Sequence, residues 1–522
     1  MAAQAQSITP QRNETQDGLN NIIAMLVAAL FVIIAIGALL VIVTNVNAAI
    51  TARGEDEAVG TTVLRFLNNY GIIVPMILGG LGIYFLGLGL RLFRMEASAA
   101  AWGKQLLLWL LVVASVLFLQ AYNSGTSGID GTAGRGIQLA LPFVIAAFVF
   151  GIAMWWMNNN QTLYRGSETL AATSSRTAWN LLLPTIAVLV VVALRPLEAT
   201  FVASLTDREF ASAREPNFIG FDNYARLLGF RIDTIPCARD AAGACALDRN
   251  GETDFPSPRS YFEDVGADPN YRALGFDPVN RVTIGDNQLV FSARDANFAD
   301  SVGDTLTFTI FSVIIELILG LGIAMIINSK FSGRGLLRTA MLVPWAIPTV
   351  VSARLWDIML RPDQTGVINH FFVNVIPVFD RSQAWLASAE LQLPALIAID
   401  VWKTTPFMAL ILLAGLQVIS GDIYEAADVD GASKVRQFFS ITLPLLRPTI
   451  AVALVFRTLD AIRVFDLFQV LLNGRYSMAT YNYNVLIRQQ DFGYASAVGV
   501  IIFVIILVFA IAYVRILGVN RE

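Results

Sequence analysis

Residues 425–431 read EAADVDG, and residues 441–444 read ITLP. Strongly apolar segments lie on both sides of this passage. The paired alanines give a short helix a small face, and Gly431 stands where a left-handed residue would end that helix. Pro444 comes just before the next apolar segment. The passage therefore predicts a short helix, a glycine turn, a second short helix and then a membrane span.

Composition places the chain in a membrane. Of its 522 residues, 56% are hydrophobic and 15% are charged, which is typical of polytopic membrane proteins. A bilayer core needs roughly 20 apolar residues per helix, and about ten segments approach that length. They cover approximately residues 22–43, 71–90, 105–120, 137–157, 179–194, 305–327, 337–360, 391–413, 449–472 and 495–517. The sequence predicts an all-α polytopic membrane protein with about ten transmembrane helices.

Basic residues indicate the orientation of these spans. The polar amino-terminal segment lacks the basic region and cleavage site of a secretory signal, so the first span is expected to stay as an anchor. Counting crossings from a cytoplasmic amino terminus places these basic residues inside: Arg91, Arg94, Lys104, Arg165, Arg176, Lys330, Arg334, Arg338, Lys434, Arg436 and Arg447. Both termini and the loop around Glu425 are then expected in the cytoplasm.

Charge and cysteine content argue against several functions. A formal net charge of −4, with basic residues spread over short loops, gives no basic patch for nucleic acid. Cys237 and Cys245 are the two cysteines, and they either close a small disulfide loop or remain free thiols. Neither has the neighbouring ligands of a zinc site, so we expect no metal and no cofactor.

A long polar segment separates residues 194 and 304. It is rich in Asp, contains no Lys and carries several prolines, among them Pro216 and Pro269. It is too polar to span a membrane and too long for a simple connection, which predicts a small extracytoplasmic insertion. Alternating residues on either side of Gly285-Asp286-Asn287 predict a short β-hairpin.

The chain has no phosphate cradle in its sequence. A P-loop requires Gly-Lys followed by Ser or Thr. Gly103-Lys104 is followed by Gln105, and no other lysine follows a glycine. We therefore expect no ATPase site here. The single histidine, His370, lies in a predicted external loop, where a solvated surface role is expected.

Charged residues within the predicted spans are candidate functional residues, because an ion at membrane depth is costly without a partner or a wet cavity. Arg457, Asp460, Arg463 and Asp466 follow one another at intervals of three, which predicts i,i+3 ion pairs. A second set is expected to be buried and structural: Glu316, Arg354, Asp357, Asp400 and Lys403. Within it, Glu316 is expected to neutralise Arg457 or Arg354 across helices.

From residue 179 onward the sequence resembles permease subunits of binding-protein-dependent ABC importers, in the maltose and trehalose branch. The motifs that carry the resemblance are Leu183-Pro184, FIGFDNY at 218–224, TLTFT at 305–309, PWAIP at 344–348, VWKTTP at 401–406 and EAADVDG at 425–431. The last is similar to the EAA loop of that family and is the one highly specific motif. LNGRY at 472–476 departs from the Gly-Gly-Pro that relatives often show.

The resemblance implies a type I ABC importer transmembrane domain with a small extracytoplasmic insertion. Residues 1–178 would then be accessory transmembrane helices and 179–194 the first helix of the permease core. Residues 195–303 would be the insertion and 304–522 the core, with the coupling loop at about 417–448. In the maltose branch an insertion at this place contacts the substrate-binding protein, and a plain solvated loop is the alternative.

Partners and residue roles also follow from the resemblance. It implies a second homologous permease, two ATPase subunits, an extracytoplasmic sugar-binding protein, a sugar and membrane lipid, in a bacterial inner membrane. Contact with the ATPase is expected from Glu425, Ala426, Ala427, Asp430, Gly431, Ile441, Leu443 and Pro444. Contact with the sugar is expected from Arg457, Asp460, Ala461, Val464, Phe465 and Trp402. For the charged residues, an internal ion-pair ladder is the alternative role.

The resemblance favours an α-linked disaccharide or maltodextrin as substrate. A glycerol phosphate, a polyol or another oligosaccharide are alternatives on the same fold. Two rivals come from other classes of protein: a polytopic membrane glycosyltransferase, and a secondary transporter that uses Glu316 or Asp460 as a proton relay. Dependence of uptake on ATP and co-purification of an ATPase would separate these from an importer subunit.

Overall fold

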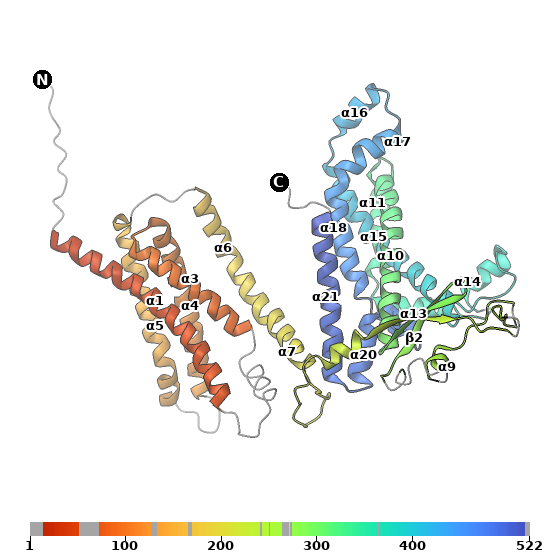
Figure 1. The fold of residues 1–522 in the computed structure, drawn as a ribbon. Coiled ribbons are helices and arrows are strands. Elements are labelled where there is room, and N and C mark those ends of the chain that lie inside the picture. Colours follow the sequence, from red (N-terminus) through yellow and green to blue (C-terminus); the bar gives the residue numbers. More distant parts are fainter. Residues whose placement is uncertain are drawn as a thin grey trace. The chain divides into compact units, whose positions relative to one another are not determined.

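The computed structural model describes residues 14–51, 73–126, 133–164, 170–240, 243–249, 251–263, 271, 274–363 and 365–516. Arg165 and Pro269, used in the sequence interpretation, lie outside these ranges. The chain divides into two compact units, Met1–Val202 and Ala203–Glu522 (Figure 1).

The described part of the first unit is helical. Its elements are α1 (Glu14–Thr51), α3 (Ile73–Phe93), α4 (Ala97–Thr126), α5 (Ala133–Asn159), η1 (Gln161–Leu163), α6 (Leu170–Leu189), η2 (Val190–Leu194) and α7 (Arg195–Ser204), the last of which ends in the second unit. Helix α1 packs on α3, and α4 packs on α5. The approach of α3 to α1 is close, because a Cβ at Gly89 would lie only 2.8 Å from Val32 Cγ2. Phe31, Leu92 and Met157 form part of the core.

Most of the predicted spans are found as long apolar helices. Within the described residues, eight helices are long and apolar enough to cross a membrane, and a bent pair makes nine if it is one span. The remaining predicted span, 179–194, falls in α6 and η2. The helical backbone continues from α6 through η2 into α7 without a gap. A π-helical segment, η2, interrupts the regular α-helix in this stretch.

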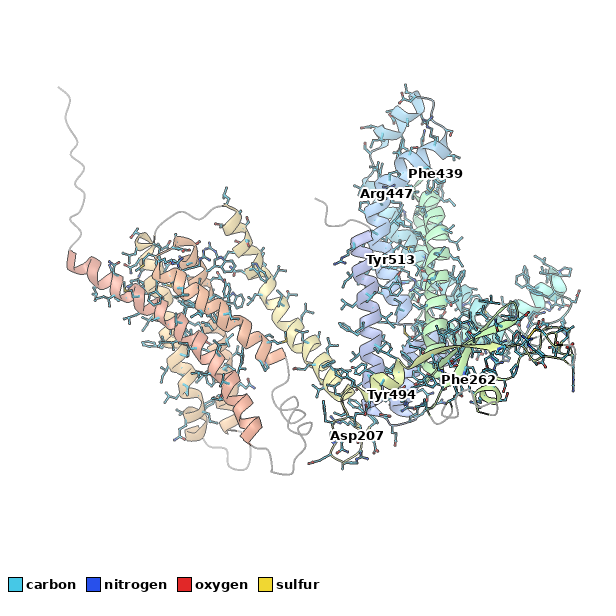
Figure 2. All side chains as sticks on the ribbon, in the orientation of Figure 1. Asp207, Phe262, Phe439, Arg447, Tyr494 and Tyr513 are labelled. Atoms are coloured by element: carbon cyan, nitrogen blue, oxygen red, sulfur yellow. A yellow bond between two sulfur atoms is a disulfide. The ribbon has the colours of Figure 1, made fainter. Side chains whose placement is uncertain are left out.

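Four long helices form the body of the second unit: α10 (Ala296–Asn328), α15 (Ala389–Val418), α18 (Leu443–Ile462) and α21 (Phe492–Ile516). Helix α10 packs against α15 and α18, and α18 packs against α21. Figure 1 shows α16 (Gly421–Val429) and α17 (Lys434–Gln437) at one end of this bundle. In Figure 2, Phe439 and Arg447 lie near that end and Tyr494 lies toward the other. The other elements that follow α10 in the chain are α11 (Arg334–Ala340), α12 (Leu342–Ala346), α13 (Thr349–Met359), α14 (Val367–His370), η3 (Phe371–Val375), η4 (Phe438–Thr442), α19 (Asp466–Leu471) and α20 (Met478–Ile487).

The predicted insertion contains a three-stranded antiparallel sheet in the order β1-β3-β2, with β1 (Phe230–Pro236), β2 (Asp277–Ile284) and β3 (Asn287–Ala293). The predicted hairpin is confirmed: β2 and β3 pair across a two-residue turn in which Gly285 has φ +60°. The sequence interpretation missed β1. The short helix α9 (Pro258–Glu263) packs on the sheet through Phe262, and α8 (Asp222–Leu227) packs against α21. Cys237 and Cys245 form a disulfide.

Two predicted spans are not continuous helices. The segment 337–360 breaks between α12 and α13, where the helix direction turns by 89°. Pro348 is the residue before α13 and has no backbone N–H to continue the ladder. The segment 449–472 breaks at Arg463, which ends α18, before α19 begins at Asp466.

The expectation that Arg354 and Asp357 are buried is wrong. Their side chains in α13 are 66% and 44% exposed, and the guanidinium lies 3.5 Å from the carboxylate. Both residues project from a short helix after the break, so they do not enter the bundle core.

Candidate functional site

The loop between α15 and α18 has the local structure that its sequence predicts. Ser420 caps α16, and the helix ends before Gly431, whose φ is +73°. The Ala432 N–H then donates to the Ala427 carbonyl at 2.9 Å, the closing bond of a left-handed helix end. Ser433 caps the second short helix, and Pro444 stands in the first turn of α18.

Interactions within the loop hold its two short helices together. The Asp428 carboxylate accepts hydrogen bonds from Lys434 Nζ at 2.7 Å and from Gln437 Nε2 at 2.5 Å. These donors, Lys434 foremost, lower the pKa of Asp428 below its usual value. The Tyr424 hydroxyl lies 2.9 Å from Thr442 Oγ1 and joins α16 to η4.

The predicted coupling residues differ in exposure. Glu425, Ala426, Asp430 and Gly431 are exposed, Ala427 is buried, and Ile441, Leu443 and Pro444 are half-buried. The same loop exposes large apolar side chains that the sequence interpretation did not select, among them Val429, Val435 and Phe439. An apolar side chain in a polar loop between two spans is the signal that could have identified them.

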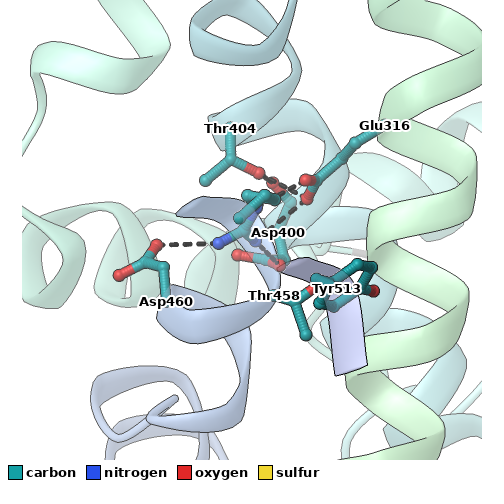
Figure 3. Close-up of polar contacts among 7 residues, drawn as sticks. Glu316, Asp400, Thr404, Thr458, Asp460 and Tyr513 are labelled. Carbon is teal, nitrogen blue, oxygen red and sulfur yellow. Dashed lines mark hydrogen bonds and ion pairs between the residues drawn. The ribbon is translucent and has the colours of Figure 1, made fainter. Parts of the chain in front are cut away.

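A buried ion cluster joins three helices of the bundle. Arg457 of α18 is 3% exposed, and Glu316 of α10 is fully buried. Arg457 Nε donates to Glu316 Oε2 at 2.5 Å, and its terminal nitrogens donate to Glu316 Oε1 at 2.9 Å, to Asp400 and to Asp460 Oδ2 at 2.7 Å. Figure 3 shows the three carboxylates and the Thr404 hydroxyl, which donates to Glu316 Oε1 at 2.5 Å.

The cluster bears on two expectations, the partner of Arg457 and the series of i,i+3 ion pairs. The predicted neutralisation of Arg457 by Glu316 is confirmed, and Asp460 forms the predicted i,i+3 pair. Arg463, instead of continuing the ladder, donates from Nε to the Leu459 carbonyl at 3.1 Å at the end of α18. Thr404 was missed, although its position one turn after Asp400 places both on one helix face.

A cavity of about 440 Å³ opens beside this cluster. Its walls come from the α12–α13 break, from α15 and from the α18–α19 break. Five of the six predicted sugar-contact residues line it: Arg457, Asp460, Ala461, Val464 and Phe465. Trp402 packs against Trp356, with ring centroids 5.5 Å apart, and is not among the described residues of the cavity wall.

A second charged contact lies in the segment that departs from Gly-Gly-Pro. Arg475 forms a fork with Asp304 of α10, with Nε and Nη2 each 2.6 Å from a carboxylate oxygen. Its remaining terminal nitrogen donates to the Ala389 carbonyl at the start of α15 at 2.8 Å. This arginine therefore fixes the 472–476 segment to α10 and α15, a role that its position in a predicted loop did not reveal.

Part of the second unit is similar in sequence to a known protein family. Residues 316–518 match the family of binding-protein-dependent transport system inner membrane components. The trehalose/maltose transport system permease protein MalF of Thermococcus litoralis is 44% identical over 239 residues, covering 45% of this chain and 78% of the relative. The trehalose transport system permease protein SugA of Mycobacterium tuberculosis is 40% identical over 220 residues, covering 41% of this chain and 68% of the relative.

A solved structure of a bacterial ABC transporter involved in alginate import is 21% identical, with a TM-score of 0.46, over 67% of this chain and 98% of the other. The family assignment comes from the sequence matches. The chain belongs to the binding-protein-dependent transport system inner membrane components, the membrane-spanning permeases of ABC transporters.

Proposed function

We propose that this chain is the permease subunit of an ATP-driven importer for a neutral disaccharide of the maltose or trehalose type. The cavity beside the Arg457 cluster is the observation that carries the proposal. Its roughly 440 Å³ lies at a double helix break inside the bundle, and five residues selected as sugar contacts line it. Arg457 and Asp460 offer polar atoms there, and Phe465 offers an aromatic face for a sugar ring.

The charges of the cavity favour a neutral sugar over a sugar phosphate. Within the described wall, the acidic residues Asp400, Asp460 and Asp466 balance the basic residues Lys403, Arg457 and Arg463. Arg457 is already bonded to carboxylates, Lys403 is bonded to backbone carbonyls, and Arg463 donates to the Leu459 carbonyl. The equal numbers of acidic and basic side chains give the wall no net positive charge to attract an anion, whereas sugar hydroxyls can donate to the exposed Asp460 carboxylate.

The loop carrying Glu425 and Gly431 is proposed to dock on a separate ATPase subunit in the cytoplasm. Exposed Val429, Val435 and Phe439 support this proposal, because apolar side chains on a polar loop favour a protein interface. Glu425 would meet a basic residue, and Ala426 would allow close approach. The motor would drive two homologous permeases between outward- and inward-open states. Both termini would lie in the cytoplasm.

The division of labour along the chain is also part of the proposal. Residues 1–178 would form accessory helices, and 179–194 would be the first helix of the permease core. The insertion at 195–303 would receive the sugar-binding protein, and 304–522 would provide the translocation path. The compact sheet and disulfide of the insertion support a binding surface there.

Reconstitution tests the proposal. The chain is assembled with its partner permease, ATPase and binding protein in nanodiscs, and ATP hydrolysis is measured with maltose, trehalose or glycerol phosphate. Stimulation by a neutral disaccharide is expected, and none by glycerol phosphate. Stimulation by glycerol phosphate alone would refute the substrate class. Uptake into vesicles that follows a proton gradient without ATP would refute the importer assignment.

A further inference from the structure

One charged side chain from α15 lies against the break between α12 and α13. Lys403 is 7% exposed. Its Nζ donates to the Ile347 carbonyl at 2.5 Å and lies 3.4 and 3.5 Å from the carbonyl oxygens of Trp345 and Pro344. The ammonium therefore sits where the α12 backbone stops being helical.

The three carbonyls need such a partner. The last carbonyls of a helix have no partner within the helix and carry the negative end of its dipole. At membrane depth an unsatisfied carbonyl is costly, so an unwound backbone there is tolerated only with other partners. An ammonium has three donors and no acceptor, which matches three converging carbonyls.

The same segment forms one wall of the cavity. Residues 345–349 line it, and this range includes Ile347, whose carbonyl Lys403 binds most closely. Trp345 also stacks on Phe407, one turn beyond Lys403 in α15, with ring centroids 5.5 Å apart and planes at 6°. An apolar contact and a charged contact from α15 thus fix the two sides of this backbone segment.

We propose that Lys403 is a positioning residue that acts as a tethered cation. It holds the broken backbone at Trp345 and Ile347 against α15 and so keeps the cavity wall in place for transport. In discontinuous helices of other transporter classes, unwound carbonyls coordinate a coupling ion. In this chain the ammonium of Lys403 fills that position, and it is not a sugar contact. The test of this role by ATPase activity rests on the proposed function.

Chemical rescue tests this role in the full reconstituted complex. Lys403→Ala removes three methylenes and the ammonium, which together correspond to n-propylammonium. We expect disaccharide-stimulated ATPase activity to fall roughly tenfold, the effect of losing charge-assisted hydrogen bonds. n-Propylammonium chloride should restore it severalfold. Tetramethylammonium chloride at the same concentration, which has charge but no N–H donor, should not.

Lys403→Met is the matched control, since methionine fills the space of the lysine stem without a cation. Its disaccharide-stimulated ATPase activity should be low, and n-propylammonium should not restore it. Full activity of Lys403→Met, or equal effects of the two ammonium salts on Lys403→Ala, would overturn the inference. If Lys403→Ala does not assemble, n-propylammonium during purification should restore the complex on size exclusion, and failure to do so also overturns it. The melting temperature of Lys403→Ala gives a readout that does not depend on sugar. It should rise with n-propylammonium chloride and not with tetramethylammonium chloride. An inactive wild-type complex would instead count against the proposed function.

Discussion

Arg457 and Glu316 are 141 residues apart in sequence and form a two-bond fork in the core of the second unit. Arg457 also binds Asp400, so one guanidinium joins α10, α15 and α18. Helix α15 ends at Val418, where the coupling loop starts, and α18 begins at Leu443, in its last part. The cluster therefore connects both helices that flank the loop with the cavity wall.

Replacing Arg457 tests this connection. Arg457→Met leaves two buried carboxylates without their cation, and breaking a buried pair in this way costs about 3–5 kcal/mol. We expect a clear fall in the melting temperature of the purified complex. Adding Glu316→Gln should recover part of the loss. Arg354→Met, in an exposed i,i+3 pair of α13, is the control and should change little. Equal melting temperatures for the two arginine variants would contradict the assigned role.

The exposed carboxylate of Asp460 is proposed to accept a sugar hydroxyl. Asp460→Asn keeps the shape and weakens the acceptor, so the disaccharide concentration for half-maximal ATPase stimulation should rise about tenfold, with melting nearly unchanged. Asp357→Asn removes a similarly placed carboxylate from α13, outside the described cavity wall, and should leave that concentration unchanged. A common response of both variants would exclude a specific contact at Asp460.

Gly431 is expected to be essential for coupling because of its backbone conformation. With φ at +73°, a β-branched residue there costs about 1–2 kcal/mol or distorts the loop, although nothing lies within 4 Å of the added Cβ. Gly431→Val should retain ATP hydrolysis and lose uptake, measured as sugar transported per ATP in vesicles. Gly421 has equally open surroundings without a positive φ, so Gly421→Val is the matched control. Unchanged uptake with Gly431→Val would refute the coupling role.

Acid should loosen the loop through Asp428. The pKa of its carboxyl is lowered in the folded loop by hydrogen bonds from Lys434 and Gln437. A lowered pKa contributes stability that is fully present above the unfolded value near 3.8 and is lost as pH falls through the folded value. The melting difference between wild type and Asp428→Asn should be small and constant above about pH 5 and disappear in stronger acid. A difference that persists there would contradict this assignment.

Local sequence signals predicted the spans, the hairpin and the turn at Gly431, because each depends on residues close in the chain. The helix breaks were not predicted. Pro394 and Pro406 lie inside the continuous helix α15, whereas Pro344 and Pro348 accompany a break. Proline removes the same donor in each case. Packing against neighbouring helices decides whether the chain bends, and one sequence does not contain that information.

The sequence predicted which charged residues belong to the candidate site, but not their contacts. Charge at membrane depth singled out Arg457, Asp460 and Glu316. The pairing of these side chains could not be predicted, because it depends on α10, α15 and α18 meeting at one point. Lys403 shows the limit most clearly, because its partners are backbone carbonyls, which have no signature in side-chain identity.

The disulfide between Cys237 and Cys245 has a practical consequence for following transport in real time. These are the two cysteines of the chain, and with both oxidised no thiol remains for maleimide reagents. A single cysteine introduced beside the cavity would then be the unique attachment point for a spin label or fluorophore. Conformational cycling could be recorded on an otherwise native background.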